Sequence, residues 1–141
     1  MKIEKTKIDS VKITEQTKMN IIRKSDFVDD VQVTNKGTPL FSWIDISLTE
    51  LCNRLCVFCP RIDSNVYPNQ NLHMSLGLLD KINEELVNLK YRGGVVFCGY
   101  GEPLLHPQIK EIISIFGNEI RTEIVTNGDK LSADLILDLF D

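Results

Sequence analysis

The chain has 141 residues, of which 43% are hydrophobic and 26% are charged, and its formal net charge is -4. This composition suits one globular domain and excludes a disordered chain, while the acidic balance argues against nucleic acid as a partner. No segment approaches the roughly 20 apolar residues that span a bilayer, and the first residues lack the apolar stretch of a signal peptide. We therefore expect a cytoplasmic protein with no membrane partner.

Residues 1–40 are predicted to form an N-terminal extension that precedes the main domain, residues 41–141. Short apolar alternations in this extension, such as "VKIT" (11–14) and "VQVTN" (31–35), are separated by charged residues and closed by "NKGTP" (35–39). The pattern indicates a small hairpin or an arm, and no chemistry is assigned to it.

From Trp43 onward, the hydrophobic period alternates between that of strands and that of helices. "WIDISL" alternates with period two, which predicts a strand. Ser75 is a typical N-cap, and the leucines that follow it recur at helical spacing. By the same criteria, strands are expected at 43–48, 95–98 and 120–128, and helices at 75–89, 107–117 and 132–140. The predicted order is therefore βαβαβα.

This order predicts an α/β fold with parallel strands, because each helix returns the chain to the same edge of the sheet. Ligands of such folds bind at the carboxyl ends of the strands. Three unusual segments follow the three strands at that edge: "CNRLCVFC" (52–59), "GYGEP" (99–103) and "TNG" (126–128). We therefore expect them to form one site.

Three of the four cysteines, Cys52, Cys56 and Cys59, follow the first strand with the spacing C-x3-C-x2-C. A structural zinc site takes four ligands, typically as two pairs, and here there is a single group of three. Zinc stays open as an alternative because a fourth ligand is available from Cys98, His73 or His106. Three thiolates in one loop instead favour a [4Fe-4S] cluster, in which they hold three irons and leave the fourth open to a substrate.

At these residues the sequence resembles the radical S-adenosylmethionine (SAM) enzymes, whose pattern is C-x3-C-x-aromatic-C, with Phe58 in the aromatic position. The resemblance implies that Cys52, Cys56 and Cys59 ligate the cluster. It also implies that SAM chelates the open iron through its amino and carboxylate groups, and that Phe58 lies close to the adenine.

The segment after the second strand resembles the Gly-Gly-Glu-Pro motif of that family, which holds the SAM amino group. Gly101, Glu102 and Pro103 match the motif, and Tyr100 replaces its first glycine. "TNG" resembles the end of the family's third strand. The cofactor-binding residues implied by the resemblance are Phe58, Gly99, Gly101, Glu102, Pro103, Thr126 and Asn127. No residue is assigned as a catalytic acid, base or nucleophile.

The resemblance implies a partial (β/α)6 radical SAM barrel, which is similar to a TIM barrel, and residues 41–141 supply only its first three β/α units. We therefore expect the chain to be the N-terminal part of a longer protein, with the N-terminal half of the core domain. Because later strands complete the SAM pocket in the family, the 141-residue chain alone is expected to bind a cluster poorly and to cleave little SAM.

The function implied by the resemblance is reductive cleavage of SAM to methionine and a 5'-deoxyadenosyl radical, which abstracts hydrogen from an unknown small-molecule or peptide substrate. An electron donor such as a flavodoxin or ferredoxin is the expected protein partner. The alternative is a non-catalytic interaction module stabilised by zinc or by a cluster. Arg54 and Arg61 flank the thiols; the default expectation is two solvated loop residues, although either could tune the cluster or dock the donor.

Overall fold

The structure is a computed structural model, which describes residues 14–28, 31–117 and 119–140. The chain divides into two compact units between Ser42 and Trp43. The first contains helix α1, Glu15–Val28, where the sequence predicted a hairpin or an arm. A small hairpin is present further on, since Val33 and Pro39 form an antiparallel bridge. The "VKIT" segment lies almost wholly outside the described residues.

The polar sequence of α1 explains why this helix was missed. Its residues, "EQTKMNIIRKSDFV", include too few apolar side chains to form a clear helical stripe. The helix begins instead with a polar cap: the Thr14 hydroxyl accepts a hydrogen bond from the Thr17 amide at 3.2 Å.

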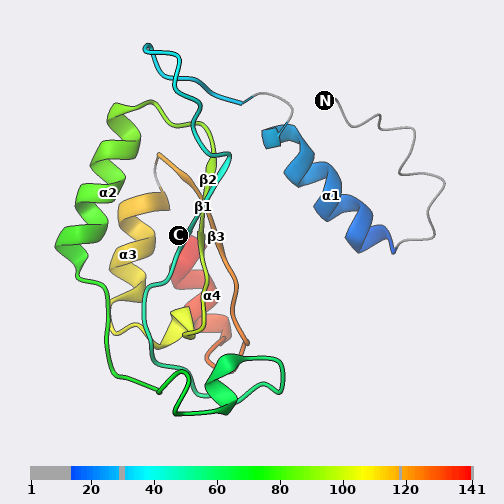
Figure 1. Cartoon of the computed structure of the whole chain (residues 1–141), viewed down its shortest axis with the longest axis vertical. Coiled ribbons are helices and arrows are strands. Elements are labelled where there is room, and N and C mark those ends of the chain that lie inside the picture. The colour runs from blue at the N-terminus through cyan, green and yellow to red at the C-terminus, as the bar shows by residue number, and fades with distance from the viewer. Residues whose placement is uncertain (1–13, 29–30, 118, 141) are drawn as a thin grey trace. The chain divides into compact units, whose positions relative to one another are not determined.

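The second unit is built on a parallel sheet of three strands, β1 (Trp43–Ile46), β2 (Gly94–Phe97) and β3 (Arg121–Ile124), in the order β1-β2-β3. Trp43 pairs with Gly94, and Gly94 pairs with Arg121. Figure 1 shows the three strands side by side, each followed by a helix. The predicted α/β fold is confirmed, with three parallel strands in one open sheet.

Strands β1 and β3 both end earlier than predicted, and only β1 does so because its backbone changes partner. After β1, the Leu48 carbonyl accepts a hydrogen bond from the Met74 amide at 2.9 Å, and Thr49 bridges His73 in antiparallel fashion. After β3, the Val125 amide still donates to the Phe97 carbonyl at 3.0 Å. The chain then turns away through Gly128, which has a φ of 82°.

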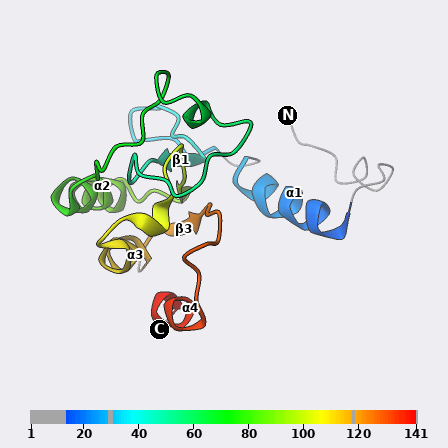
Figure 2. The same cartoon turned by 90° about the horizontal axis from the view of Figure 1, so that it is seen from below.

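The helices that follow the strands are α2 (Leu76–Asn88), α3 (Ile109–Gly117) and α4 (Ala133–Phe140). Ser75 caps α2 as predicted, because its hydroxyl accepts a hydrogen bond from the Leu78 amide. Helix α3 contacts both α2 and α4, and Figure 2 shows α2 and α3 on one side of the sheet. Among the described residues, no helix is long and apolar enough to cross a membrane.

Two short 3-10 helices, η2 (Pro60–Ile62) and η3 (Pro103–Leu105), lie in the loops that follow β1 and β2. Pro107 falls in the turn after η3, so α3 begins later than the residue-107 start expected from the sequence. The Ile109 amide donates to the His106 carbonyl at 3.2 Å, which closes this turn.

The core of the second unit lies between the sheet and its helices. Phe97 of β2 and Phe116 of α3 are fully buried, and their rings meet edge to face with centroids 5.3 Å apart. Such pairs stabilise beyond the area that they bury, by about 1 kcal/mol. The packing fixes the strands relative to their helices and leaves the loops at the carboxyl ends to form a site.

Candidate functional site

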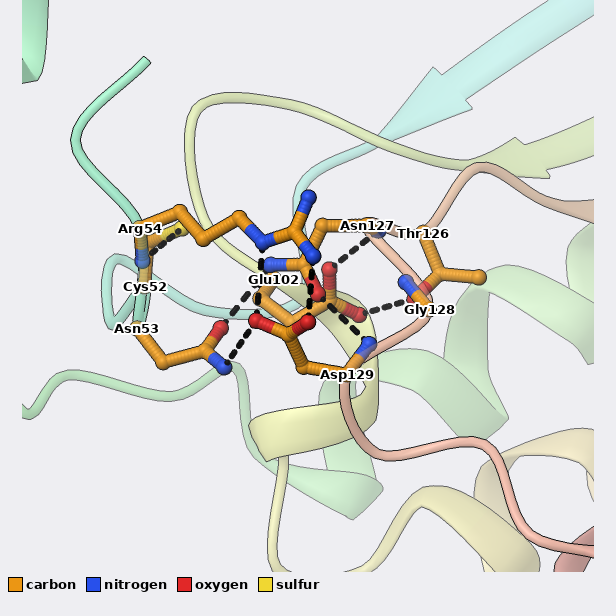
Figure 3. A network of polar contacts seen from close by, with 8 residues as sticks. All are labelled: Cys52, Asn53, Arg54, Glu102, Thr126, Asn127, Gly128 and Asp129. Carbon is orange, nitrogen blue, oxygen red and sulfur yellow. Dashed lines mark hydrogen bonds and ion pairs between the residues drawn. The ribbon is translucent and has the colours of Figure 1, made fainter.

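The loops after β1, β2 and β3 meet at the carboxyl edge of the sheet, as the predicted strand order requires. Hydrogen bonds join them directly: Glu102 of the second loop contacts Thr126 of the third, and Asn53 of the first contacts Asp129 of the third. Figure 3 shows this network from close by.

Glu102 is the buried centre of the network, with 3% of its surface exposed. Its Oε1 atom accepts hydrogen bonds from the Leu104 amide at 3.0 Å and from the Thr126 hydroxyl at 2.6 Å. Its Oε2 atom accepts one from the Asn127 amide at 2.8 Å. An ionised carboxylate offers about four acceptor positions. Three are taken by the protein, so Oε2 can accept one further donor.

The side chain of Asn127 joins the third loop to the cysteine loop. Its Nδ2 atom donates to Asn53 Oδ1 at 2.8 Å, and its Oδ1 atom accepts from the Asp129 amide at 3.0 Å. Asn53 in turn donates to Asp129 Oδ2 at 3.0 Å. Thr126 and Asn127, both predicted to bind the cofactor, therefore contact Glu102 and the cysteine loop in this structure.

Arg54 is not the simply solvated residue expected from the sequence. Its guanidinium makes a two-pronged ion pair with Asp129, in which Nε donates to Oδ2 at 2.8 Å and a terminal nitrogen contacts Oδ1. The pair raises the pKa of Arg54 and lowers the pKa of Asp129, in both cases chiefly through the hydrogen bond between them. No local pattern in the sequence points to Asp129, which lies 75 positions from Arg54.

Arg61 differs even more from expectation, because only 3% of its surface is exposed. Its guanidinium donates to the backbone carbonyls of Glu50 and Tyr100 and to Asn69 Oδ1 at 3.0 Å. It also lies over the Tyr67 ring, 4.7 Å from the centroid. The expectation of a solvated residue is wrong here, because three segments of the chain, at residues 50, 67–69 and 100, enclose the guanidinium.

The three cysteines of the loop are free and partly buried. The Cys59 amide donates to the Cys56 carbonyl at 2.9 Å, and the Arg54 amide lies 3.5 Å from Cys52 Sγ. Within the part of the chain that the structure describes, no three His, Cys, Asp or Glu side chains are gathered closely enough to hold a metal ion. The donor set, three reduced thiols in one loop, fits an iron-sulfur cluster. In this structure the three thiols are spread apart rather than gathered around one point.

Cys98, one candidate for a fourth zinc ligand, is engaged elsewhere. Burial raises the pKa of its thiol, and the neighbouring carboxyl of Asp45, which is hydrogen-bonded to it, raises the pKa further. A thiol with a raised pKa is a poorer metal ligand, because metals bind the thiolate. The other two candidates, His73 and His106, pack against each other with ring centroids 5.1 Å apart.

The glycines of "GYGEP" are required by close contacts. A Cβ atom on Gly101 would lie 1.8 Å from the Thr49 carbonyl oxygen, and one on Gly99 would lie 2.5 Å from Ser47 Oγ. Tyr100 between them is half exposed, and its ring packs edge to face on Tyr67. The turn therefore accommodates tyrosine where the resembling motif has its first glycine.

The remaining predicted site residues, Phe58 and Pro103, differ in solvent exposure. Pro103 is fully buried at the start of η3, directly after Glu102. The Phe58 side chain is 88% exposed, beside the thiols of Cys56 and Cys59 in sequence. Its ring is accessible to a ligand and contributes little to the protein core.

Known proteins resemble this chain over the unit that carries the site. The chain is 33% identical over 96 residues to the S-adenosyl-L-methionine-dependent 2-deoxy-scyllo-inosamine dehydrogenase of Niallia circulans, covering 66% of this chain and 38% of that protein. The crystal structure of BtrN in complex with AdoMet and 2-DOIA superposes with a TM-score of 0.65 at 31% identity, covering 72% of this chain and 42% of BtrN.

A second structure, of selenomethionine BtrN in an open conformation, has a TM-score of 0.61 at 31% identity and covers 72% of this chain and 45% of BtrN. The chain thus spans less than half the length of the relatives that it matches. The sequence pattern of the Radical SAM superfamily matches residues 46–141, and the chain belongs to that superfamily.

Proposed function

We propose that the protein is a radical SAM enzyme that binds a [4Fe-4S] cluster and SAM at the carboxyl edge of its sheet. The observation that carries this proposal is the junction of the three-thiol loop with the loop of Glu102, made by Asn53, Asn127 and Asp129. Membership of the superfamily and the SAM named in the relatives support it.

Cys52, Cys56 and Cys59 would hold the cluster, because they are the three free thiols of one loop. When bound and reduced by an external donor, such a cluster would supply the one electron needed for cleavage of SAM to methionine and a 5'-deoxyadenosyl radical. The protein's contribution is to hold SAM in place and to exclude water around it.

Glu102 is proposed to receive the SAM amino group at the free acceptor position of Oε2. An ammonium donor on a buried carboxylate makes a strong, charge-assisted hydrogen bond. Thr126 and Asn127 orient that carboxylate through their own hydrogen bonds, so we assign them to positioning it. Gly101 brings the turn close to Thr49, and the exposed ring of Phe58 is proposed to pack on the adenine.

For the reaction, we propose dehydrogenation of a small molecule. The deoxyadenosyl radical would take one hydrogen atom and become 5'-deoxyadenosine, and the substrate radical would then lose a proton and pass its remaining electron to an oxidised iron-sulfur centre. The support is the relative at 33% identity, which is a dehydrogenase of 2-deoxy-scyllo-inosamine. This favours a small polar substrate over a peptide. A flavodoxin or ferredoxin as electron donor and a cytoplasmic location stay predictions.

Anaerobic reconstitution with iron and sulfide tests the proposal. In a longer version that carries the later strands of the barrel, we expect near-stoichiometric acid-labile sulfide, and SAM binding that is much tighter with the cluster than without it. The 141-residue chain alone should show less of both. 5'-Deoxyadenosine should form in the longer version when a strong reductant is added, and little should form with the 141-residue chain. Binding of zinc with no labile sulfide would contradict the cluster assignment. Equal SAM affinity with and without the cluster would contradict the enzyme assignment.

A further inference from the structure

Arg61 carries a buried positive charge that no carboxylate among the described residues neutralises. A guanidinium is always protonated in proteins, and this one is 3% exposed. Its hydrogen-bond partners are the carbonyls of Glu50, Tyr100 and Pro68 and the side-chain amide of Asn69, all of which are neutral. Buried charges are normally paired with an opposite charge. Over residues 14–28, 31–117 and 119–140, no carboxylate forms an ion pair with it.

The same guanidinium is one side chain away from the first cysteine. Asn69, which accepts from Arg61 through Oδ1, also accepts from the Cys52 amide through that atom at 2.9 Å. Its Nδ2 atom donates to the Cys52 carbonyl at 3.0 Å. Both backbone polar groups of Cys52 are therefore held by Asn69, and Asn69 is held by Arg61.

Arg61 also reaches the other half of the site. It donates to the Tyr100 carbonyl inside "GYGEP", next to Gly101, and it follows Cys59 by two positions. A single side chain thus connects the start of the cysteine loop, its end and the turn that leads into Glu102. The anions expected at this junction are thiolates, which carry negative charge when they bind iron.

We propose that Arg61 is a positioning residue that anchors the cysteine loop through Asn69 and supplies a buried positive charge that the thiolates of a bound cluster offset. This rests on the proposed function, because it requires a cluster at Cys52, Cys56 and Cys59. A fixed positive charge favours the reduced, more negative state of a cluster and therefore raises its reduction potential. The proposal thus assigns to Arg61 an effect on the potential as well as on the loop.

The substitution Asn69→Asp separates the charge from the anchor. Aspartate keeps the acceptors for the Cys52 amide and for Arg61, and it replaces the donor to the Cys52 carbonyl with a second acceptor that repels this carbonyl. It also gives Arg61 a carboxylate partner, which cancels the buried charge. Asn69→Ala removes the anchor and leaves the charge. Arg61→Met removes the charge, and Arg61→Lys retains it with fewer donors.

The experiment is a redox titration of each reconstituted protein, followed by the electron paramagnetic resonance of the reduced cluster. We expect Asn69→Asp and Arg61→Met to shift the midpoint potential to more negative values. Arg61→Lys should stay at the wild-type potential. Asn88→Asp, at the exposed end of α2, adds the same charge away from the site and should leave the potential unchanged.

Equal midpoint potentials in the wild type and in Asn69→Asp would overturn the proposal. Equal shifts of the midpoint potential in Arg61→Lys and Arg61→Met would also overturn it. If Arg61→Met fails to load a cluster that Arg61→Lys still loads, the charge is supported, because only lysine keeps it. Equal failure of both variants would overturn the charge role and leave a structural one. A wild type that takes up no iron and sulfide would instead refute the proposed function.

Discussion

The two sides of the candidate site differ in how they are held. On one side, Glu102 is 3% exposed and three hydrogen bonds from the protein fix its carboxylate. On the other, the middle of the cysteine loop exposes 84% of Val57 and 88% of Phe58. A substitution on the first side should therefore reduce folding stability as well as binding. A substitution in the middle of the loop should reduce binding alone.

The largest effect expected is loss of the cluster from the cysteine side. Replacement of Cys52, Cys56 or Cys59 by alanine should reduce iron and labile sulfide to background, because each thiolate is a ligand in the proposed site. Since these thiols are not core residues, the melting temperature of the cluster-free protein should hardly change. Iron and sulfide analysis with calorimetry measures both.

Cys98→Ala is the matched control for the three cysteine variants. Its thiol is partly buried and hydrogen-bonded to Asp45, so this variant should load a normal amount of cluster. A loss of cluster equal to that of Cys59→Ala would show that the ligand set has been assigned wrongly.

Glu102→Ala should produce the largest loss of folding stability at the site. Three donors, the Leu104 and Asn127 amides and the Thr126 hydroxyl, would lose their acceptor. We expect a cost of about 3 kcal/mol, because hydrogen bonds to charged groups contribute more than neutral ones and buried donors are left unsatisfied. Urea denaturation of the cluster-free protein measures it. Glu111→Ala, at an exposed position of α3, should change stability by less than about 0.5 kcal/mol.

The ion pair between Arg54 and Asp129 should contribute a smaller, pH-dependent stability. Arg54 lowers the pKa of Asp129 in the folded protein, so the contribution is complete above the ordinary aspartate pKa of about 4. It is lost as the pH falls through the lower folded pKa. The wild type should therefore exceed Asp129→Asn in stability at neutral pH, and the two should converge in strong acid. High salt should also reduce the difference; a difference that grows in acid would exclude this pair as its source.

The smallest effect on stability is expected for Phe58→Ala, because the ring is almost fully exposed. The free energy of unfolding should change by less than about 0.5 kcal/mol. If the ring packs on the adenine of SAM, its loss should weaken SAM binding by about 1 kcal/mol, or roughly fivefold. Calorimetric titration of the cluster-loaded protein tests this, and unchanged affinity would remove Phe58 from the site.

Local patterns in the sequence predicted most of the second unit. The period-two alternation of "WIDISL" and the cap at Ser75 correspond to β1 and the start of α2. The strand order also predicted that the three loops meet. The C-terminal end of β1 was harder to predict, because pairing with β2 stops at Ile46 and Leu48 accepts instead from the Met74 amide. That exchange depends on a distant segment.

The supporting residues of the site could not be predicted in this way. Arg54 and Asp129 are 75 positions apart, and no local period or motif relates them. Arg61 is a charged residue in a loop, so the sequence alone suggests that it is solvated. Its burial arises from contacts with Asn69, Tyr67 and Tyr100, which only the fold brings together. The motif residues themselves were found because their spacing is local.

The wide separation in sequence of the site's contacts has a consequence for the order of folding. The turn between Cys56 and Cys59 closes over three positions, whereas Asn53 and Asp129 are 76 positions apart. Short loops close in well under a microsecond, and contacts of high sequence separation form late. During synthesis, the thiols emerge before β2 and β3 exist. A metal captured at that stage would be held by the cysteine loop alone, and the Glu102 network would close around it only after β3 has paired with β2.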